Sequence, residues 1–116
     1  EGVEPVIAAR AERPIPDPYA DDPEYGERSA AATRSWDPAR LAHVMRGATY
    51  ADLPIRTHIA TIAVPTTILA WTGDPVHPLS TAEELHGLIA GSELHVARTA
   101  DEFAGWTDIV AETIGR

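Results

Sequence analysis

The residues of this 116-residue chain that are best placed to do chemistry lie in one short loop, Trp71-Thr72-Gly73-Asp74-Pro75-Val76-His77-Pro78. Gly73 allows a tight turn there, and the two prolines stiffen the backbone that follows. The carboxylate of Asp74 could orient a histidine and stabilise the imidazolium that forms during acyl transfer, so Asp74 is a candidate catalytic acid and His77 a candidate base. The alternative is that Asp74 only caps a turn and that His77 makes a local contact with it.

Two short apolar runs predict the strands that would position this loop. Residues 66–71 and 92–97 are rich in β-branched and apolar residues, which is typical of strands buried on both faces of a parallel sheet. Between them, residues 80–83 resemble a capping box at the start of a helix that Gly91 ends. The order strand, helix, strand predicts a parallel pair with a right-handed crossover. Reactive groups in such sheets gather just beyond the carboxyl ends of the strands, which is where the loop lies.

Three further segments have helical signals. Asp37-Pro38 predicts the start of a helix that Gly47 closes. Asp52-Leu53-Pro54 predicts a second start, and Pro65 ends that segment. Residues 99–102 resemble another capping box, and they precede the apolar stripe of a last helix, Phe103, Trp106, Ile109 and Val110.

Residues 1–35 differ in composition from the rest of the chain. They hold five of the ten prolines and eight of the eighteen acidic residues. The alternating prolines of residues 14–18 cannot lie inside a helix, because each ring removes a hydrogen-bond donor and biases the preceding residue toward extended geometry. We therefore expect residues 1–35 to form an irregular, proline-rich, acidic arm with a short helix near residues 5–10, and residues 36–116 to form an α/β segment.

Composition excludes several classes of function. The chain has no cysteine, so it has no disulfide framework and no thiolate site. Its nine basic residues, all arginine, oppose eighteen acids and give a net charge of −9, which disfavours binding to nucleic acid or to anionic membranes. No apolar run is long enough for a membrane span and no signal-peptide pattern opens the chain, so we expect a cytoplasmic protein.

Neither metals nor cofactors are expected. The histidines show no metal-binding spacing, the glycines form no phosphate-cradling loop, and residues 21–24 lack the pattern of a calcium loop and are typical of a solvated acidic turn. The three tryptophans are expected to serve packing, because large aromatic side chains mostly do so; they are Trp36, Trp71 and Trp106.

The ordered series of segments over residues 52–97 resembles the C-terminal part of α/β-hydrolase-fold proteins. Ile62-Ala63-Val64-Pro65-Thr66-Thr67-Ile68-Leu69-Ala70-Trp71 is similar to the strand that precedes the acid loop, and Gly73-Asp74-Pro75-Val76-His77-Pro78 is similar to the loop itself. The resemblance implies a partial α/β-hydrolase fold in which Asp74 is the triad acid and residues 1–48 are the end of the cap region. It also implies hydrolysis of an ester, a lactone or a similar bond in a small, largely apolar molecule.

The chain departs from the family pattern in two ways. It contains no Gly-x-Ser-x-Gly, so the nucleophile is expected upstream of these residues, and residues 97–103 contain no histidine where the family has its base. His95 lies in the second predicted strand and is expected to be packed or hydrogen-bonded there. The chain alone should then be inactive. An alternative function is that of a catalytically degenerate binding or interaction module.

Two parallel strands make a poor sheet by themselves, since both edges need covering. We therefore expect association with a missing N-terminal part or with a second copy, most simply as a two-fold dimer.

Overall fold

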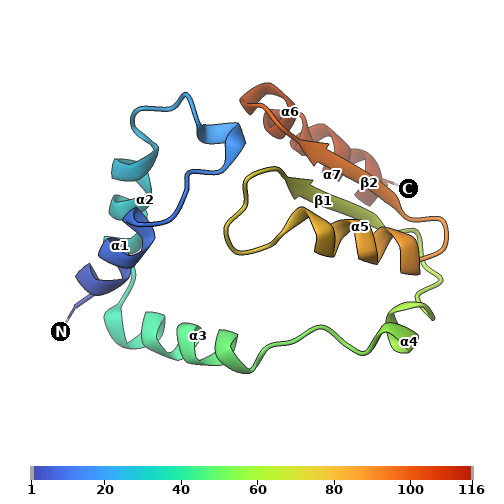
Figure 1. The fold of residues 1–116 in the computed structure, drawn as a ribbon, viewed down its shortest axis with the longest axis horizontal. Coiled ribbons are helices and arrows are strands. Elements are labelled where there is room, and N and C mark those ends of the chain that lie inside the picture. Colours follow the sequence, from blue (N-terminus) through green and yellow to red (C-terminus); the bar gives the residue numbers. More distant parts are fainter. Residues whose placement is uncertain (1, 116) are drawn as a thin grey trace. The chain divides into compact units, whose positions relative to one another are not determined.

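The computed structural model describes residues 2–115, which divide into two compact units (Figure 1). The helical unit comprises residues 2–13 and 22–53, and the sheet unit comprises residues 14–21 and 54–115. Helices combined with a two-stranded parallel sheet make the chain a mixed α/β protein, as the sequence predicts.

The helical unit contains α1 (Glu4–Ala11), α2 (Tyr25–Arg34) and α3 (Pro38–Tyr50). Helix α3 begins as predicted, because the side chain of Asp37 accepts a hydrogen bond of 2.8 Å from the backbone N–H of Arg40. The helix does not end at Gly47 but continues to Tyr50. A glycine within a helix costs about 1 kcal/mol relative to alanine, which does not by itself end a helix.

Helices α1 and α2 are joined by polar contacts around Thr33, whose exposed fraction is only 2%. The hydroxyl of Thr33 accepts a hydrogen bond of 2.9 Å from Arg10 Nη1 and donates one of 2.9 Å to the carbonyl oxygen of Ser29. At the surface, Arg34 forms two hydrogen bonds with the carboxylate of Glu4, at 3.0 and 3.2 Å. The guanidinium of Arg34 lowers the pKa of Glu4.

The prediction of an irregular arm over residues 1–35 is wrong in its main part. The short helix near residues 5–10 is confirmed as α1, but Tyr25–Arg34 also form a helix, α2. Residues 21–24 form the acidic turn before α2, in which Asp22 pairs with Arg28. The prolines of residues 1–35 indicate irregular structure, but alanine and arginine predominate in residues 27–34, and this composition favours a helix.

The sheet unit is built on β1 (Thr67–Trp71) and β2 (Glu93–Ala97), which pair in parallel from Thr67 opposite Glu93 to Trp71 opposite Ala97. Both strands and their parallel pairing are confirmed. At the ends of the pair, the N–H of Glu93 donates to the carbonyl oxygen of Thr66, and the N–H of Thr72 donates to that of Ala97.

Helices cover both faces of this sheet. Helix α5 (Leu79–Leu88) packs on one face, and α6 (Ala100–Ala104) and α7 (Trp106–Gly115) lie on the other (Figure 1). The unit also contains a single helical turn, α4 (Arg56–Ile59), and a 3₁₀ turn, η1 (Asp17–Tyr19). Arg56 pairs with Glu84 of α5.

Helix boundaries in the sheet unit depart from the sequence signals. The segment after residue 54 forms only the one turn of α4, because little beyond Ile59 is buried there. Helix α5 begins after Pro78 with no side-chain cap, so residues 80–83 do not act as a capping box. The side chain of Thr99 caps α6 by accepting a hydrogen bond from the N–H of Glu102. The return bond of the predicted capping box is displaced by one residue, because the carboxylate of Glu102 accepts from the N–H of Arg98, at 2.6 Å. The predicted last helix is divided at Gly105.

Four aromatic rings form the centre of the sheet unit at the carboxyl end of the strands. Trp71 and Trp106 stack with their ring planes 4° apart and their centroids 5.6 Å apart. Phe103 lies 5.1 Å from Trp71 and 4.9 Å from Trp106, and Tyr19 lies 5.3 Å from Phe103. The packing role expected of Trp71 and Trp106 is confirmed, whereas Trp36 in the helical unit is 43% exposed.

Among the helices that the structure describes, none combines the length and the apolar character needed to cross a membrane.

Candidate functional site

The loop that follows β1 begins with a left-handed glycine. Gly73 has a φ of +70°, a conformation that an L-residue with a side chain rarely adopts. This turn places Asp74 beyond the carboxyl end of β1, the position where parallel sheets carry reactive groups. The loop then continues over Pro75 to His77 and enters α5 at Leu79.

The carboxylate of Asp74 is held by its own loop. Its Oδ1 accepts hydrogen bonds from the backbone N–H of Val76, at 2.7 Å, and of His77, at 2.9 Å. Its Oδ2 lies 3.2 Å from Nδ1 of the His77 imidazole. The turn-capping interpretation of Asp74 is therefore correct as a description of Oδ1, and the local contact between the two side chains exists as well.

The environment of Asp74 favours its ionised form. Partial burial acts to raise the pKa of this carboxyl, but the two backbone N–H donors and the nearby imidazole outweigh that effect, so the pKa of Asp74 lies below its ordinary value. The side chain of Asp74 is only 9% exposed, whereas that of His77 is 82% exposed. The pair thus combines a sheltered, fixed carboxylate with an imidazole that solvent can reach.

This geometry allows a defined division of roles. If Nδ1–H of His77 donates to Asp74 Oδ2, Nε2 is left without a proton and can accept one from a hydroxyl group. A carboxylate in this position orients the imidazole and stabilises its protonated form. The arrangement can support general base chemistry, given a nucleophile within reach of Nε2.

This loop also makes a contact, not predicted from the sequence, with residues far from it in the chain. The backbone N–H of Asp17 donates a hydrogen bond of 3.1 Å to the carbonyl oxygen of Thr72, so η1 lies against the start of the loop. The available signal was Gly73 itself, because a glycine at the end of a strand often marks a close approach of another backbone segment.

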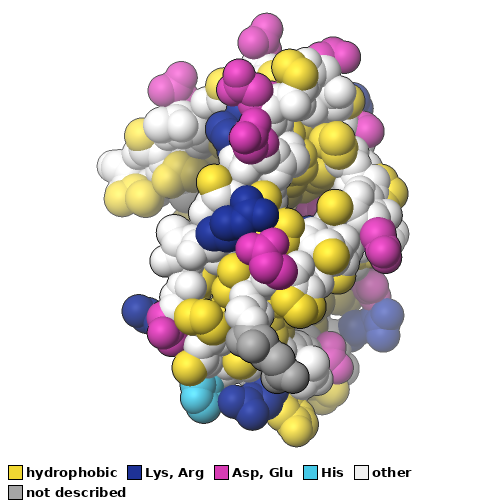
Figure 2. Space-filling view, turned by 90° about the vertical axis from the view of Figure 1, so that its left-hand side faces the viewer, with side chains coloured by type: hydrophobic (Ala, Val, Ile, Leu, Met, Phe, Trp, Pro, Cys, Tyr) yellow, Lys and Arg dark blue, Asp and Glu magenta, His cyan; other side chains and the backbone are white. Residues whose placement is uncertain are grey.

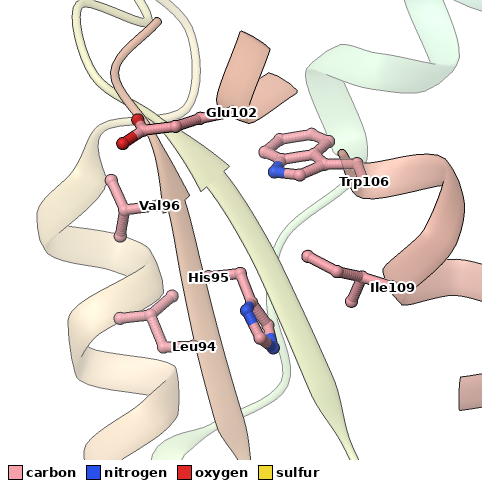
Figure 3. Close-up of a pocket in the computed structure, with 6 residues that line it drawn as sticks. All are labelled: Leu94, His95, Val96, Glu102, Trp106 and Ile109. Atoms are coloured by element: carbon pink, nitrogen blue, oxygen red, sulfur yellow. The ribbon is translucent and has the colours of Figure 1, made fainter. Parts of the chain in front are cut away.

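His95 lies in β2, as expected, but its Nε2 is buried without a hydrogen-bond partner among the described residues. This atom lies 3.7 Å from the nearest carboxylate oxygen of Glu93, too far for a hydrogen bond. Figure 3 shows the ring on the side of β2 where Trp106 and Ile109 lie, opposite Leu94 and Val96.

These residues and Glu102 line a hollow of about 320 Å³ (Figure 3). Neither Asp74 nor His77 lines it, so the hollow does not mark the candidate acid–imidazole pair.

The other histidines do not join the site. His86, in α5, places Nδ1 2.9 Å from the hydroxyl of Ser92, a contact between the end of α5 and the start of β2. His43 lies on α3, where Arg46 Nη2 is 3.4 Å from its Nδ1, and His58 lies on α4. Across residues 2–115, no three His, Asp or Glu side chains are grouped closely enough to hold a metal ion.

Comparison of the chain with protein-family models, with curated proteins and with solved structures finds no match.

Proposed function

We propose that this chain is the C-terminal part of an acyl hydrolase with an α/β-hydrolase fold, in which Asp74 is the acid that orients the catalytic imidazole. The observation that carries the proposal is the sheltered carboxylate of Asp74, fixed beyond the carboxyl end of a parallel strand with Oδ2 facing an imidazole at 3.2 Å. The parallel pairing of β1 and β2, the intervening α5 and the order of segments over residues 52–97 support the same assignment.

In this proposal His77 accepts the proton of a serine hydroxyl through Nε2 while Asp74 stabilises the resulting imidazolium. The serine and the oxyanion-hole donors come from a preceding segment. The serine oxygen bonds to the acyl carbon of a small, largely apolar ester or lactone, and the alcohol oxygen leaves with the proton that His77 returns. Water then attacks the acyl-serine, with His77 accepting its proton, and the acid is released as the serine recovers its proton.

The charge of the chain does not favour a nucleic-acid substrate, and Figure 2 shows one face of the molecule. Acidic, basic and apolar side chains are intermixed there and form no continuous basic surface. With a net charge of −9, the chain lacks the electrostatic attraction that a nucleic-acid substrate requires.

The proposal is tested by expressing the chain together with the residues that its reading frame encodes before Glu1, and by measuring hydrolysis of p-nitrophenyl esters. We expect activity in the longer protein and a loss of kcat of about 10⁴-fold in Asp74→Asn, the effect typical of removing a triad carboxylate. The isolated 116 residues should show no turnover that depends on Asp74. The matched control is Asp108→Asn, an exposed acid of α7.

Unchanged kcat in Asp74→Asn, or Asp74-dependent turnover by the isolated chain, would contradict the proposal.

The alternative function is a binding or interaction module without catalysis. It is favoured by the absence of histidine from residues 97–103 and by the use of both Asp74 oxygens within their own loop. A reading frame with no Gly-x-Ser-x-Gly before Glu1, together with a lack of ester hydrolysis, would select this alternative.

A further inference from the structure

We infer that Asp17 is a positioning residue for the candidate acid: its backbone amide holds the Thr72-Gly73 turn that places Asp74. This inference rests on the proposed function for its catalytic meaning. The contacts that carry it all lie within the sheet unit.

The first contact is a backbone hydrogen bond. The N–H of Asp17 donates to the carbonyl oxygen of Thr72 at 3.1 Å, while the N–H of Thr72 donates to Ala97 of β2 at 3.0 Å. The peptide group on one side of Thr72 is thus fixed by the sheet, and the one on the other side is fixed by η1. Asp74 begins only one residue after this anchored carbonyl group.

The second contact explains why residue 73 is a glycine. A Cβ atom on Gly73 would lie 2.6 Å from Oδ1 of Asp17, 3.0 Å from its Cγ and 3.1 Å from its backbone nitrogen. The side chain of Asp17 could move away, whereas its backbone nitrogen, which is bonded to Thr72, would have to shift by a few tenths of an ångström. A side chain at position 73 would therefore crowd η1, and it would also strain a backbone whose φ is +70°.

The segment that carries Asp17 is itself firmly held. Pro16 and Pro18, on either side of it, are buried. The ring of Tyr19 packs edge-on against Trp71, the last residue of β1, with centroids 6.0 Å apart, and against Phe103 of α6. Proline limits the backbone freedom of η1 before and after Asp17. A rigid segment fixed to the aromatic cluster can transmit its position to the loop.

A single substitution separates this contact from the rest of the fold. Asp17→Pro removes the N–H donor and places the ring Cδ where the amide hydrogen pointed, so the carbonyl group of Thr72 must move away from η1. The preceding backbone is compatible with proline, because Pro16 is extended, with φ −58° and ψ 143°. Asp17→Ala is the matched control, since it removes the carboxylate but keeps the N–H.

Two readouts follow the position of Asp74 in the full chain: hydrogen exchange of the Val76 and His77 amides, and NMR titration of the Asp74 carboxyl. In Asp17→Pro we expect both amides to exchange at least about tenfold faster, because their hydrogen bonds to the Asp74 carboxylate break more often. The midpoint of the Asp74 titration should rise toward the ordinary aspartate value. Asp17→Ala should show smaller changes in both, and amides of α5 should exchange as in the parent chain in both variants.

Equal behaviour of Asp17→Pro and Asp17→Ala in both readouts overturns the inference. If Asp17→Pro unfolds the sheet unit, Tyr19→Leu takes its place, since it loosens η1 and keeps the amide; an unchanged Asp74 titration in that variant also overturns the inference. Neither readout uses ester hydrolysis. Failure of the proposed function therefore leaves this result standing, and failure of this inference leaves the hydrolysis assay unaffected.

Discussion

Asp74 shows how one carboxylate can serve a turn and a site together. Its Oδ1 closes the turn onto Val76 and His77, and its Oδ2 remains directed at the imidazole. The turn-forming bonds therefore do not compete with a role in orienting His77. They fix the carboxylate before any substrate binds, which is the preorganisation that a catalytic group requires.

The lowered pKa of Asp74 makes part of the folding free energy depend on pH. A carboxyl whose pKa is depressed in the folded state contributes stability that is present above its unfolded pKa of about 3.9 and is lost as the pH falls through the folded value. We expect Asp74→Asn to unfold about 1 kcal/mol more easily at neutral pH, because a bond to a charged acceptor is lost. Urea denaturation of both proteins over a series of acidic and neutral pH values measures the difference.

That difference should shrink as the pH falls below about 4, because the parent carboxyl then becomes protonated. Glu4 and Asp22 also have lowered pKa values, and their contribution cancels when the two proteins are compared at each pH. A gap that stays constant across the series would show that the charge of Asp74 does not contribute to stability.

The sequence predicts the residues of the candidate site but not everything that holds them. Asp74 and His77 are close in the chain, so their contact follows from the turn chemistry of a short loop. Asp17 contacts the same loop from the opposite end of the sequence. No local sequence pattern predicts such a contact. The prolines around Asp17 indicate a rigid segment but not the residues that it contacts.

The two strands were the most predictable elements, and the helix ends were the least. Each strand begins only one residue later than predicted and ends where predicted. A short run of β-branched and apolar residues between turn residues is compatible with few structures other than a strand. Gly47 and Gly105 show why helix ends are harder. One lies inside α3 and the other separates α6 from α7. Whether a helix continues through a glycine or ends at it depends on tertiary contacts that the neighbouring sequence does not reveal.

Phe103 is expected to be the main attachment of α6 to the sheet, because its ring contacts Trp71, Trp106 and Tyr19. We predict that Phe103→Ala lowers the free energy of unfolding by about 2–3 kcal/mol, somewhat less than for a fully buried phenylalanine because the residue is only half-buried. Chemical denaturation followed by tryptophan fluorescence provides the measurement.

Val110→Ala on α7 is the control for this substitution, since Val110 is 42% exposed and should cost less than about 1 kcal/mol. Equal losses for the two variants would show that the aromatic cluster does not hold the unit together.

The division into two units changes how the first part of the chain is understood. Residues 14–21 belong with the sheet, although helical segments of the other unit precede and follow them in sequence. Composition alone predicts an arm for this stretch, because composition indicates the character of a segment but not the segment that it packs against.

The two-stranded sheet leads to a prediction about assembly. Covering its unpaired backbone groups favours self-association, most simply as a two-fold dimer. Because each chain carries a net charge of −9, two copies repel each other, and added salt should increase the dimer fraction by screening that repulsion. Sedimentation velocity at micromolar concentration, at low and high salt, tests this expectation. A compact monomer under both conditions would contradict it.

The hydrogen bond from the N–H of Arg98 to the carboxylate of Glu102 has a consequence for aggregation. The carbonyl group of Ala97, at the end of β2, accepts a hydrogen bond from the N–H of Thr72, which follows β1. The N–H of Arg98 belongs to the same trans peptide group, so it points in the opposite direction, away from β1. Glu102 occupies one backbone donor at the carboxyl end of this outer edge and places a negative charge beside it. We therefore expect this carboxylate to disfavour the pairing of a second chain with this end of β2.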